Sequence, residues 1–210
     1  MANYKDHKTW QVISNITLCN YSNIEKRLRY KDNFSNNMLI YYSLFIIINS
    51  LTAYYFTNCY NQALSKYFNV VLSIILLVYS LIYNNSKYTE RIINITKSIN
   101  SINEIRRSIN KSNIEEFKCK YYSITATTEL RTEIDFFTTV KQLCIEKNTT
   151  IWKLRKKEDI TDEMEAKIKN YISELAYIHF IQIKIYFYNF IDTIIVLIPI
   201  IIFLICCFIK

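Results

Sequence analysis

Residues able to act as nucleophiles, acid–base groups or metal ligands are scattered in this 210-residue sequence. The two histidines, His7 and His179, lie apart from any acid–base pair with the spacing of a nucleophile or a metal ligand. No two cysteines have the two-residue separation of a zinc or redox motif. The six cysteines are Cys19, Cys59, Cys119, Cys144, Cys206 and Cys207. The sequence therefore predicts a protein that is not an enzyme and that holds neither a metal nor a cofactor.

Glycine is absent from the sequence, and proline occurs once, at Pro199. Phosphate-cradling loops, dinucleotide-binding turns and nucleophile elbows all use glycine, either for a positive φ or for close approach of the backbone. None of these sites can be built here in its usual form. Because the usual turn-forming residues are also scarce, the composition favours long helices with few tight turns.

A different set of polar residues lies inside long apolar segments, where a polar side chain must be paired or must line a wet path. Asn69, Ser73 and Ser80 follow one another at offsets of four and eleven residues from the first. At about 100° per residue these offsets are about 40° and 20°, so the three side chains share one helical stripe. The stripe either holds neighbouring helices together or forms one wall of a wet path in an oligomer. The remaining candidates in the first and third segments are Asn49, Thr52 and Asp192.

Three apolar segments must position these residues. Residues 38–56 are uncharged and give about 28 Å of helix, close to the roughly 30 Å hydrocarbon core of a bilayer. Residues 67–83 are also uncharged and give about 25 Å, and residues 188–210 are apolar over most of their length. The sequence therefore predicts an all-α membrane protein. It has a transmembrane helical hairpin at 38–83 and a third, C-terminal transmembrane helix at 188–210, with helical segments at 1–37 and 84–187.

Lysine and arginine are unevenly distributed around these segments. Residues 1–37 carry six and residues 84–187 carry eighteen of the 26, whereas the connection at 57–66 carries only Lys66. The positive-inside rule assigns the basic side of a membrane protein to the cytosol. We therefore expect a multi-pass protein of the cell (inner) membrane with a cytosolic N-terminus and a cytosolic 84–187 region.

A stripe of isoleucines follows the second apolar segment at spacings of three and four, which predicts one face of a helix that continues without a break. Its members are Ile92, Ile95, Ile99, Ile102, Ile105 and Ile109. The stripe either packs on other helices of the same chain, as in a bundle, or forms the seam of a coiled coil between chains. Isoleucine at both seam positions would favour trimers or tetramers.

Further along, Ser112 and Glu115 form a capping-box pattern that predicts a new helix running on to Leu143. A loop is expected at 148–160, and a helix from residue 161 onward is expected to continue into the third span.

The expected loop carries a basic cluster beside Trp152. One interpretation is that these side chains are solvated in a loop near an anionic membrane surface. The other is that they contact lipid phosphates or a nucleotide. The members of the cluster are Lys153, Arg155, Lys156 and Lys157. Residues 84–187 carry eighteen basic against fourteen acidic residues, a net charge of +4. This charge is too dilute for a phosphate-tracking surface, so no direct nucleic-acid binding is expected.

Three stretches resemble the SLATT family of bacterial membrane effector domains. The stretch IEKRLRYKDNFSNNMLIYYSLFIII (residues 24–48) is a basic helix leading into the first span. The stretch YTERIINITKSINSINEIRRSI (residues 88–109) is an arginine-bearing helix leaving the second. The stretch KYYSITATTELRTEIDFF (residues 120–137) is similar in position to a helical block of the subgroup associated with reverse transcriptases. The third apolar segment departs from the minimal two-helix pattern of that family.

This resemblance implies an effector of an anti-phage or conflict system that permeabilises the cell's own membrane when a partner sensor is activated. The implied partners are a nucleotide synthase, a nucleotide-sensing SLOG protein or a reverse transcriptase. Three spans are too few to enclose an aqueous path, so the effector hypothesis requires a homo-oligomer in the lipid bilayer. The alternative is a membrane anchor or scaffold that forms no pore and holds a cytosolic partner at the bilayer.

Overall fold

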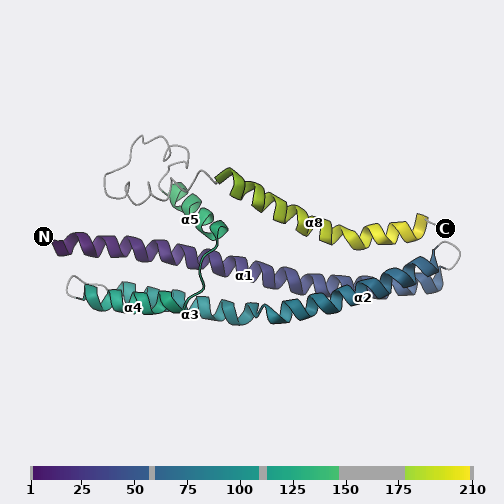
Figure 1. The fold of residues 1–210 in the computed structure, drawn as a ribbon, viewed down its shortest axis with the longest axis horizontal. Helices are drawn as coiled ribbons and strands as arrows, with labels where there is room; N and C mark the ends of the chain where they lie inside the picture. Colours follow the sequence, from purple (N-terminus) through teal and green to yellow (C-terminus); the bar gives the residue numbers. More distant parts are fainter. Residues whose placement is uncertain (1, 57–59, 109–112, 147–177, 209–210) are drawn as a thin grey trace. The chain divides into compact units, whose positions relative to one another are not determined.

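The computed structural model describes residues 2–56, 60–108, 113–146 and 178–208, and these ranges contain helices and no strand (Figure 1). The helices are α1 (Ala2–Tyr55), α2 (Gln62–Asn85), α3 (Tyr88–Arg107), α4 (Ile114–Thr127), α5 (Glu133–Glu146) and α8 (Ile178–Phe208). Three helical stretches, in α1, in α2 continuing toward α3, and in α8, are long and apolar enough to cross a membrane. The predicted all-α membrane fold is therefore confirmed.

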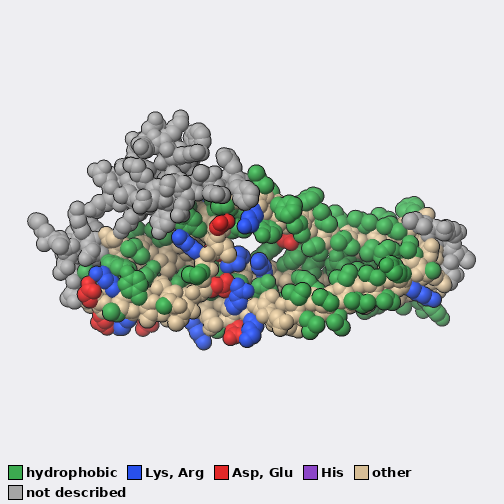
Figure 2. Space-filling model, viewed as in Figure 1, with side chains coloured by type: hydrophobic (Ala, Val, Ile, Leu, Met, Phe, Trp, Pro, Cys, Tyr) green, Lys and Arg blue, Asp and Glu red, His purple; other side chains and the backbone are tan. Residues whose placement is uncertain are grey.

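The chain divides into two compact units. Met1–Leu28 and Glu90–Ile185 form one, here called the helical unit, and Arg29–Thr89 and Tyr186–Lys210 form the other, the membrane unit. On the face shown in Figure 2, hydrophobic side chains cover the membrane unit, whereas charged side chains lie mainly on the helical unit. This segregation fits helices that meet lipid in one unit and water in the other.

The membrane unit is packed from three helices. Its buried core contains Tyr42 of α1, Leu72 of α2 and Ile202 of α8, each less than 9% exposed. Other large apolar side chains of the same helices point outward, such as Ile47 at 56% and Ile74 at 59% exposure. An apolar outer surface of this extent is unusual in water but is expected of helices in hydrocarbon.

The connection between the first two spanning helices is shorter than the predicted 57–66. Helix α1 ends at Tyr55, and α2 already begins at Gln62. The Asn61 side-chain oxygen accepts the N–H of Leu64 at 3.0 Å and so caps α2. The Asn61 N–H donates to the Cys206 carbonyl at 3.0 Å, which ties the end of α8 to this connection. An N-cap inside the polar stretch thus starts the helix before the uncharged run begins.

The uninterrupted helix predicted after the second span is wrong. Helix α2 ends at Asn85, and α3 begins at Tyr88. Lys87 has a φ of 47°, the left-handed conformation that glycine usually takes after a helix. The Ser86 N–H donates to the Ile82 carbonyl at 3.1 Å and closes the last turn. Because this chain has no glycine, a lysine takes this conformation. The residues around Lys87 contain no glycine or proline, so the sequence does not indicate that the helix ends there.

The helical unit buries the isoleucine stripe within the chain. Ile95 and Ile102 of α3 are 1% and 0% exposed. Ile24 and Leu28 of α1 are both 0% exposed. Ile92 is also buried. Three members of the stripe are therefore packed within the chain, which favours the first alternative. Ile99 and Ile105 are half-buried, and Ile109 lies outside the described residues.

The single helix predicted from residue 112 to Leu143 is also wrong, because the chain bends between α4 and α5. The Asp135 carboxylate accepts the N–H of Thr132 at 2.8 Å, and the Thr132 hydroxyl accepts the N–H of Asp135 at 3.3 Å. This reciprocal pair is a capping box at the start of α5. Ser112, the loop predicted at 148–160 with its basic cluster, and residues 161–177 of the helix predicted from residue 161 lie outside the described residues. From Ile178 onward that helix is α8, which runs into the third span without a break as predicted.

Candidate functional site

Four polar side chains meet near the α1–α2 connection and form what we call the loop-end belt: Asn49, Ser50, Tyr60 and Asn69. The Asn49 amide donates to the Asn69 side-chain oxygen at 2.7 Å, and the Asn69 amide donates to the Ser50 hydroxyl at 2.8 Å. The Tyr60 hydroxyl donates to the Asn49 side-chain oxygen. Asn49 is fully buried. The sequence placed Asn49 and Asn69 on two different spans, and the structure brings them together as the central pair of this belt.

Tyrosine hydroxyls make a second set of polar contacts at the other end of the membrane unit, the far-end belt. They donate to side chains as follows: Tyr30 to Asp192 at 3.0 Å, Tyr83 to Asp32 at 2.9 Å, and Tyr79 to Ser35 at 2.9 Å. Asp192, predicted to be a polar residue inside the third span, therefore lies at the end of the unit beside a tyrosine. Tyrosines in this position suit the interface between a bilayer and water.

The two belts are separated by an apolar interior. Ser35 and Asn49 are both on α1 and lie about 21 Å apart along the helix at ~1.5 Å per residue. Between them, the side chains packed against the buried core are apolar or aromatic, such as Phe45, Leu76 and Ile198. Within the described residues, a single copy of this unit therefore contains no polar path from one belt to the other.

The other three candidates inside the spans bond to their own helices. The Ser73 hydroxyl donates to the Asn69 carbonyl at 2.7 Å, and the Ser80 hydroxyl donates to the Leu77 carbonyl at 2.8 Å. The Thr52 hydroxyl donates in the same way to its own helix, at the Ile48 carbonyl, at 2.9 Å. The predicted stripe is consequently divided, since Asn69 turns into the loop-end belt while Ser73 is exposed on the surface of the unit.

One outer face of the hairpin is polar, and we call it the outer serine face: Ser43, Ser50, Asn69 and Ser73. Ser43 and Ser50 are seven residues apart on α1, about 700° or nearly two full turns, so they lie on one side of that helix. The Asn69–Ser50 hydrogen bond brings the Asn69 side of α2 to the same face, and Ser73 lies about 40° from Asn69. All three serines are exposed. The face is a polar strip on a surface whose large exposed side chains are mostly apolar.

Pro199 creates a specific requirement inside α8. Proline has no N–H, so the Ile195 carbonyl one turn earlier lacks its helical donor. The Tyr42 hydroxyl of α1 donates to that carbonyl at 2.6 Å, and the Tyr41 hydroxyl donates to the Val196 carbonyl at 3.2 Å. Because no water reaches the hydrocarbon core, a donor from a neighbouring helix is the way to satisfy such a group. The contact also fixes where α8 packs on α1.

Four charged side chains form an ion cluster in the helical unit: Arg27, Arg91, Glu129 and Asp135. Arg27 donates through Nε to Asp135 at 3.0 Å and through Nη2 to Glu129 at 3.4 Å. Arg91 donates through Nε to the second oxygen of Glu129 at 2.9 Å and through Nη2 to the first. The cluster thus joins α1, α3, the α4–α5 linker and α5.

The electrostatics of this cluster depend on burial. Asp135 is 2% exposed, while the side chains of Arg27 and Glu129 are 18% and 26% exposed. The hydrogen bonds from Arg91 are the main cause that lowers the pKa of Glu129, although partial burial acts in the opposite direction. Removing one partner of such a network leaves a poorly solvated charge behind. The cluster is therefore a constrained polar site of the helical unit.

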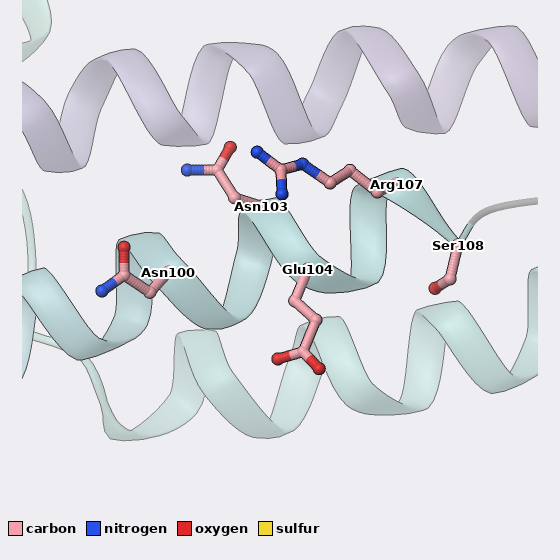
Figure 3. A pocket seen from close by; sticks show the side chains of 5 residues that line it. All are labelled: Asn100, Asn103, Glu104, Arg107 and Ser108. Atoms are coloured by element: carbon pink, nitrogen blue, oxygen red, sulfur yellow. The ribbon is translucent and has the colours of Figure 1, made fainter.

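Figure 3 shows an open groove of about 490 Å³ along α3, lined by Asn100, Asn103, Glu104, Arg107 and Ser108. Glu104 points away from Asn103 and Arg107. All five residues come from one helix and the residue after it, so no second element converges on the groove. Ligand pockets are usually enclosed by several elements. The groove therefore does not define a binding site.

The ion cluster and the Tyr42–Ile195 contact were not expected from the sequence. Arg27, Arg91, Glu129 and Asp135 fall one or two each into residues 24–48, 88–109 and 120–137, but their spacing of up to about a hundred residues carries no local signal. The Thr132-x-x-Asp135 pattern is a recognisable capping box and could have located the break before α5. The lone proline could have identified a carbonyl that needed a donor.

No protein-family model, curated protein or solved structure matches the chain.

Proposed function

We propose that this chain is a membrane effector that assembles as a homo-oligomer and permeabilises the cell's inner membrane when a partner sensor activates it. The outer serine face is the observation that carries the proposal. Several copies that turn this face toward a common axis would surround a polar path, although the interior of one copy is apolar. Since much of the isoleucine stripe is buried in the chain, the proposal assigns assembly to the membrane unit.

The biological setting in this proposal rests on the resemblance to SLATT effectors. It places the chain in an anti-phage or conflict system with a partner such as a nucleotide synthase, a SLOG protein or a reverse transcriptase. The N-terminus and the helical unit are then cytosolic, in accordance with the concentration of lysine and arginine outside the hairpin connection. In that orientation the helical unit is the part that a cytosolic sensor can reach.

The proposal is tested by reconstituting the purified 210-residue chain into vesicles of phosphatidylethanolamine and phosphatidylglycerol that contain a small dye. Dye release should rise steeply with the protein-to-lipid ratio, because several copies are required for each path. The double substitution Ser43→Leu and Ser73→Leu should abolish release, since it makes the outer serine face apolar.

Thr193→Leu is the matched control. Thr193 is also exposed on a spanning helix and also donates to its own helix, at the Asn189 carbonyl, at 2.9 Å, but it is outside the outer serine face. This variant should release dye like the wild type. Full release by the serine double variant would remove the outer serine face from the path.

The second candidate function is a membrane anchor or scaffold for a cytosolic partner. The apolar interior of the membrane unit favours it, because a sealed three-helix unit is sufficient to hold a helical unit at the bilayer. The discriminating measurement compares vesicles that contain the wild type with vesicles that contain the Glu129→Gln variant, which loses an ion pair of the helical unit. If both stay tight at every protein-to-lipid ratio, the anchor is established and the pore is excluded.

A further inference from the structure

The five-residue linker between α4 and α5, residues 128–132, makes side-chain contacts with α1, which enters the membrane hairpin, and with α3, which follows it. Its Glu129 accepts hydrogen bonds from Arg27 on α1 and from Arg91 on α3. Its Thr128 hydroxyl shares a hydrogen bond of 2.9 Å with the Ser98 hydroxyl on α3. The linker thus bridges α1 and α3 through side chains, although it is more than a hundred residues from Arg27 in the sequence.

The position of the two arginines along the chain gives this bridge its significance. Arg27 lies one residue before the end of the first part of the helical unit at Leu28. Arg91 is the second residue of the part that begins at Glu90. Each arginine therefore lies next to a point where the chain changes from one unit to the other. The Glu129 carboxylate binds both arginines and so links these two points of the chain.

We propose that the 128–132 linker is an inhibitory latch. While Glu129 holds Arg27 and Arg91, the helices entering and leaving the hairpin are fixed to each other. Release of the linker removes these ion pairs while the isoleucine stripe still packs α3, so the two helices rearrange at a lower free-energy cost. The membrane units of several copies then assemble. This inference rests on the proposed effector function, since it describes how that function is kept off.

Two features suit the linker to this role. Its ends are anchored, because Thr132 and Asp135 cap α5 and Asp135 also binds Arg27 at 3.0 Å. Its tip is accessible, because Leu130 is 85% exposed. A partner that binds Leu130 would contact the residue next to Glu129 and could displace the linker. A bistable contact of this kind needs only a modest free-energy difference to be switched by a partner.

The first test removes the latch contact with Glu129→Gln, which keeps the side-chain size and deletes the charge. At a protein-to-lipid ratio at which wild-type vesicles are tight, this variant should release dye roughly tenfold faster or more, because a partly buried ion pair has been lost. Glu133→Gln is the matched control. Glu133 is a 73% exposed carboxylate four residues away that pairs only distantly with Lys184, at 3.8 Å, and its loss should leave release unchanged.

The second test closes the latch covalently. The Ser98 and Thr128 hydroxyl oxygens are 2.9 Å apart, so the double variant Ser98→Cys and Thr128→Cys places two thiols beside each other for oxidation to a disulfide. Oxidation should prevent release even at the high protein-to-lipid ratio at which the wild type leaks, and a reductant should restore it. The two single cysteine variants carry the native cysteines and control for their oxidation.

A readout independent of leakage separates the latch from the effector function. Hydrogen exchange should increase in peptides covering 90–107 and 128–137 in the Glu129→Gln variant and not in Glu133→Gln. If wild type and Glu129→Gln vesicles are both tight at all ratios, the effector function fails. If the wild type leaks at high ratio while Glu129→Gln behaves like Glu133→Gln and the disulfide does not suppress release, the latch is refuted and the effector function stands.

Discussion

At the level of single residues, Tyr42 supplies a hydrogen-bond donor that Pro199 removes from α8. The Tyr42 hydroxyl lies 2.6 Å from the Ile195 carbonyl, in the apolar part of the membrane unit. We expect Tyr42→Phe to lower the stability of the detergent-solubilised protein by about 1–3 kcal/mol, because a buried carbonyl is left without a donor. The change would be measured as a lower midpoint of thermal unfolding.

Tyr67→Phe is the control for this substitution. Tyr67 is 64% exposed on α2, and removal of its hydroxyl should change stability by less than about 0.5 kcal/mol. Equal midpoints for the two variants would mean that the Ile195 carbonyl finds another donor and that Tyr42 does not position α8.

Glu129 gives the helical unit a specific dependence on pH. Hydrogen bonds from Arg91 lower the pKa of Glu129, so the folded state favours the ionised carboxylate. A lowered pKa contributes stability that is fully present above the ordinary carboxyl pKa and is lost as the pH falls through the lowered value. We therefore expect wild type to exceed Glu129→Gln in stability by about 1–3 kcal/mol at neutral pH, a range reduced for the partial exposure of Arg91.

That advantage should shrink as the pH falls below about 4. Thermal unfolding of both proteins over a series of pH values measures the difference. A difference that stays constant down to strongly acidic pH would show that the Glu129 carboxylate does not make the stabilising contact.

At the level of secondary-structure elements, α3 owes its position to the isoleucine stripe. Ile102 is 0% exposed, so Ile102→Ala should cost about 2–5 kcal/mol through lost burial and a residual cavity. Ile93 on the same helix is 49% exposed, and Ile93→Ala should cost less than about 1 kcal/mol. Chemical unfolding monitored by circular dichroism compares the two.

The same pair of variants tests what the stripe packs against. Because the stripe is buried within one chain, Ile102→Ala should destabilise each copy without changing how many copies associate. A variant that keeps its unfolding midpoint and loses its oligomeric state in mass measurements would instead place Ile102 at a seam between chains.

At the level of the whole molecule, the distribution of basic residues makes a prediction about orientation. Reporter fusions after residue 20 and near residue 150 should read cytosolic, and a fusion in the connection at Asn61 should read exterior. The physical reason is that 24 of the 26 lysines and arginines lie outside both that connection and the C-terminal residue. A cytosolic signal at Asn61 would reverse the orientation and place the helical unit outside the cell.

The membrane-spanning helices and the buried face of α3 could be predicted from the sequence. Both follow from properties that each residue carries locally. The free energy of transfer into hydrocarbon adds up along an uncharged run such as 38–56, and the period of 3.6 residues aligns the isoleucines whatever they pack against. Sequence spacing also identified Asn49 and Asn69 as polar residues inside spans, though not that they bond to each other.

The ends of the helices and the pairing of polar residues became visible only in the folded chain. A lysine at φ 47° ends the turn after α2, and a capping box starts α5, because backbone groups at helix ends need whatever donors and acceptors are nearby. Glu129 finds Arg27 across more than a hundred residues of chain, and the Ile195 carbonyl finds Tyr42 across 153. Such pairs are selected by the free-energy cost of leaving a buried charge or carbonyl unpaired, and that cost arises only when the helices have packed.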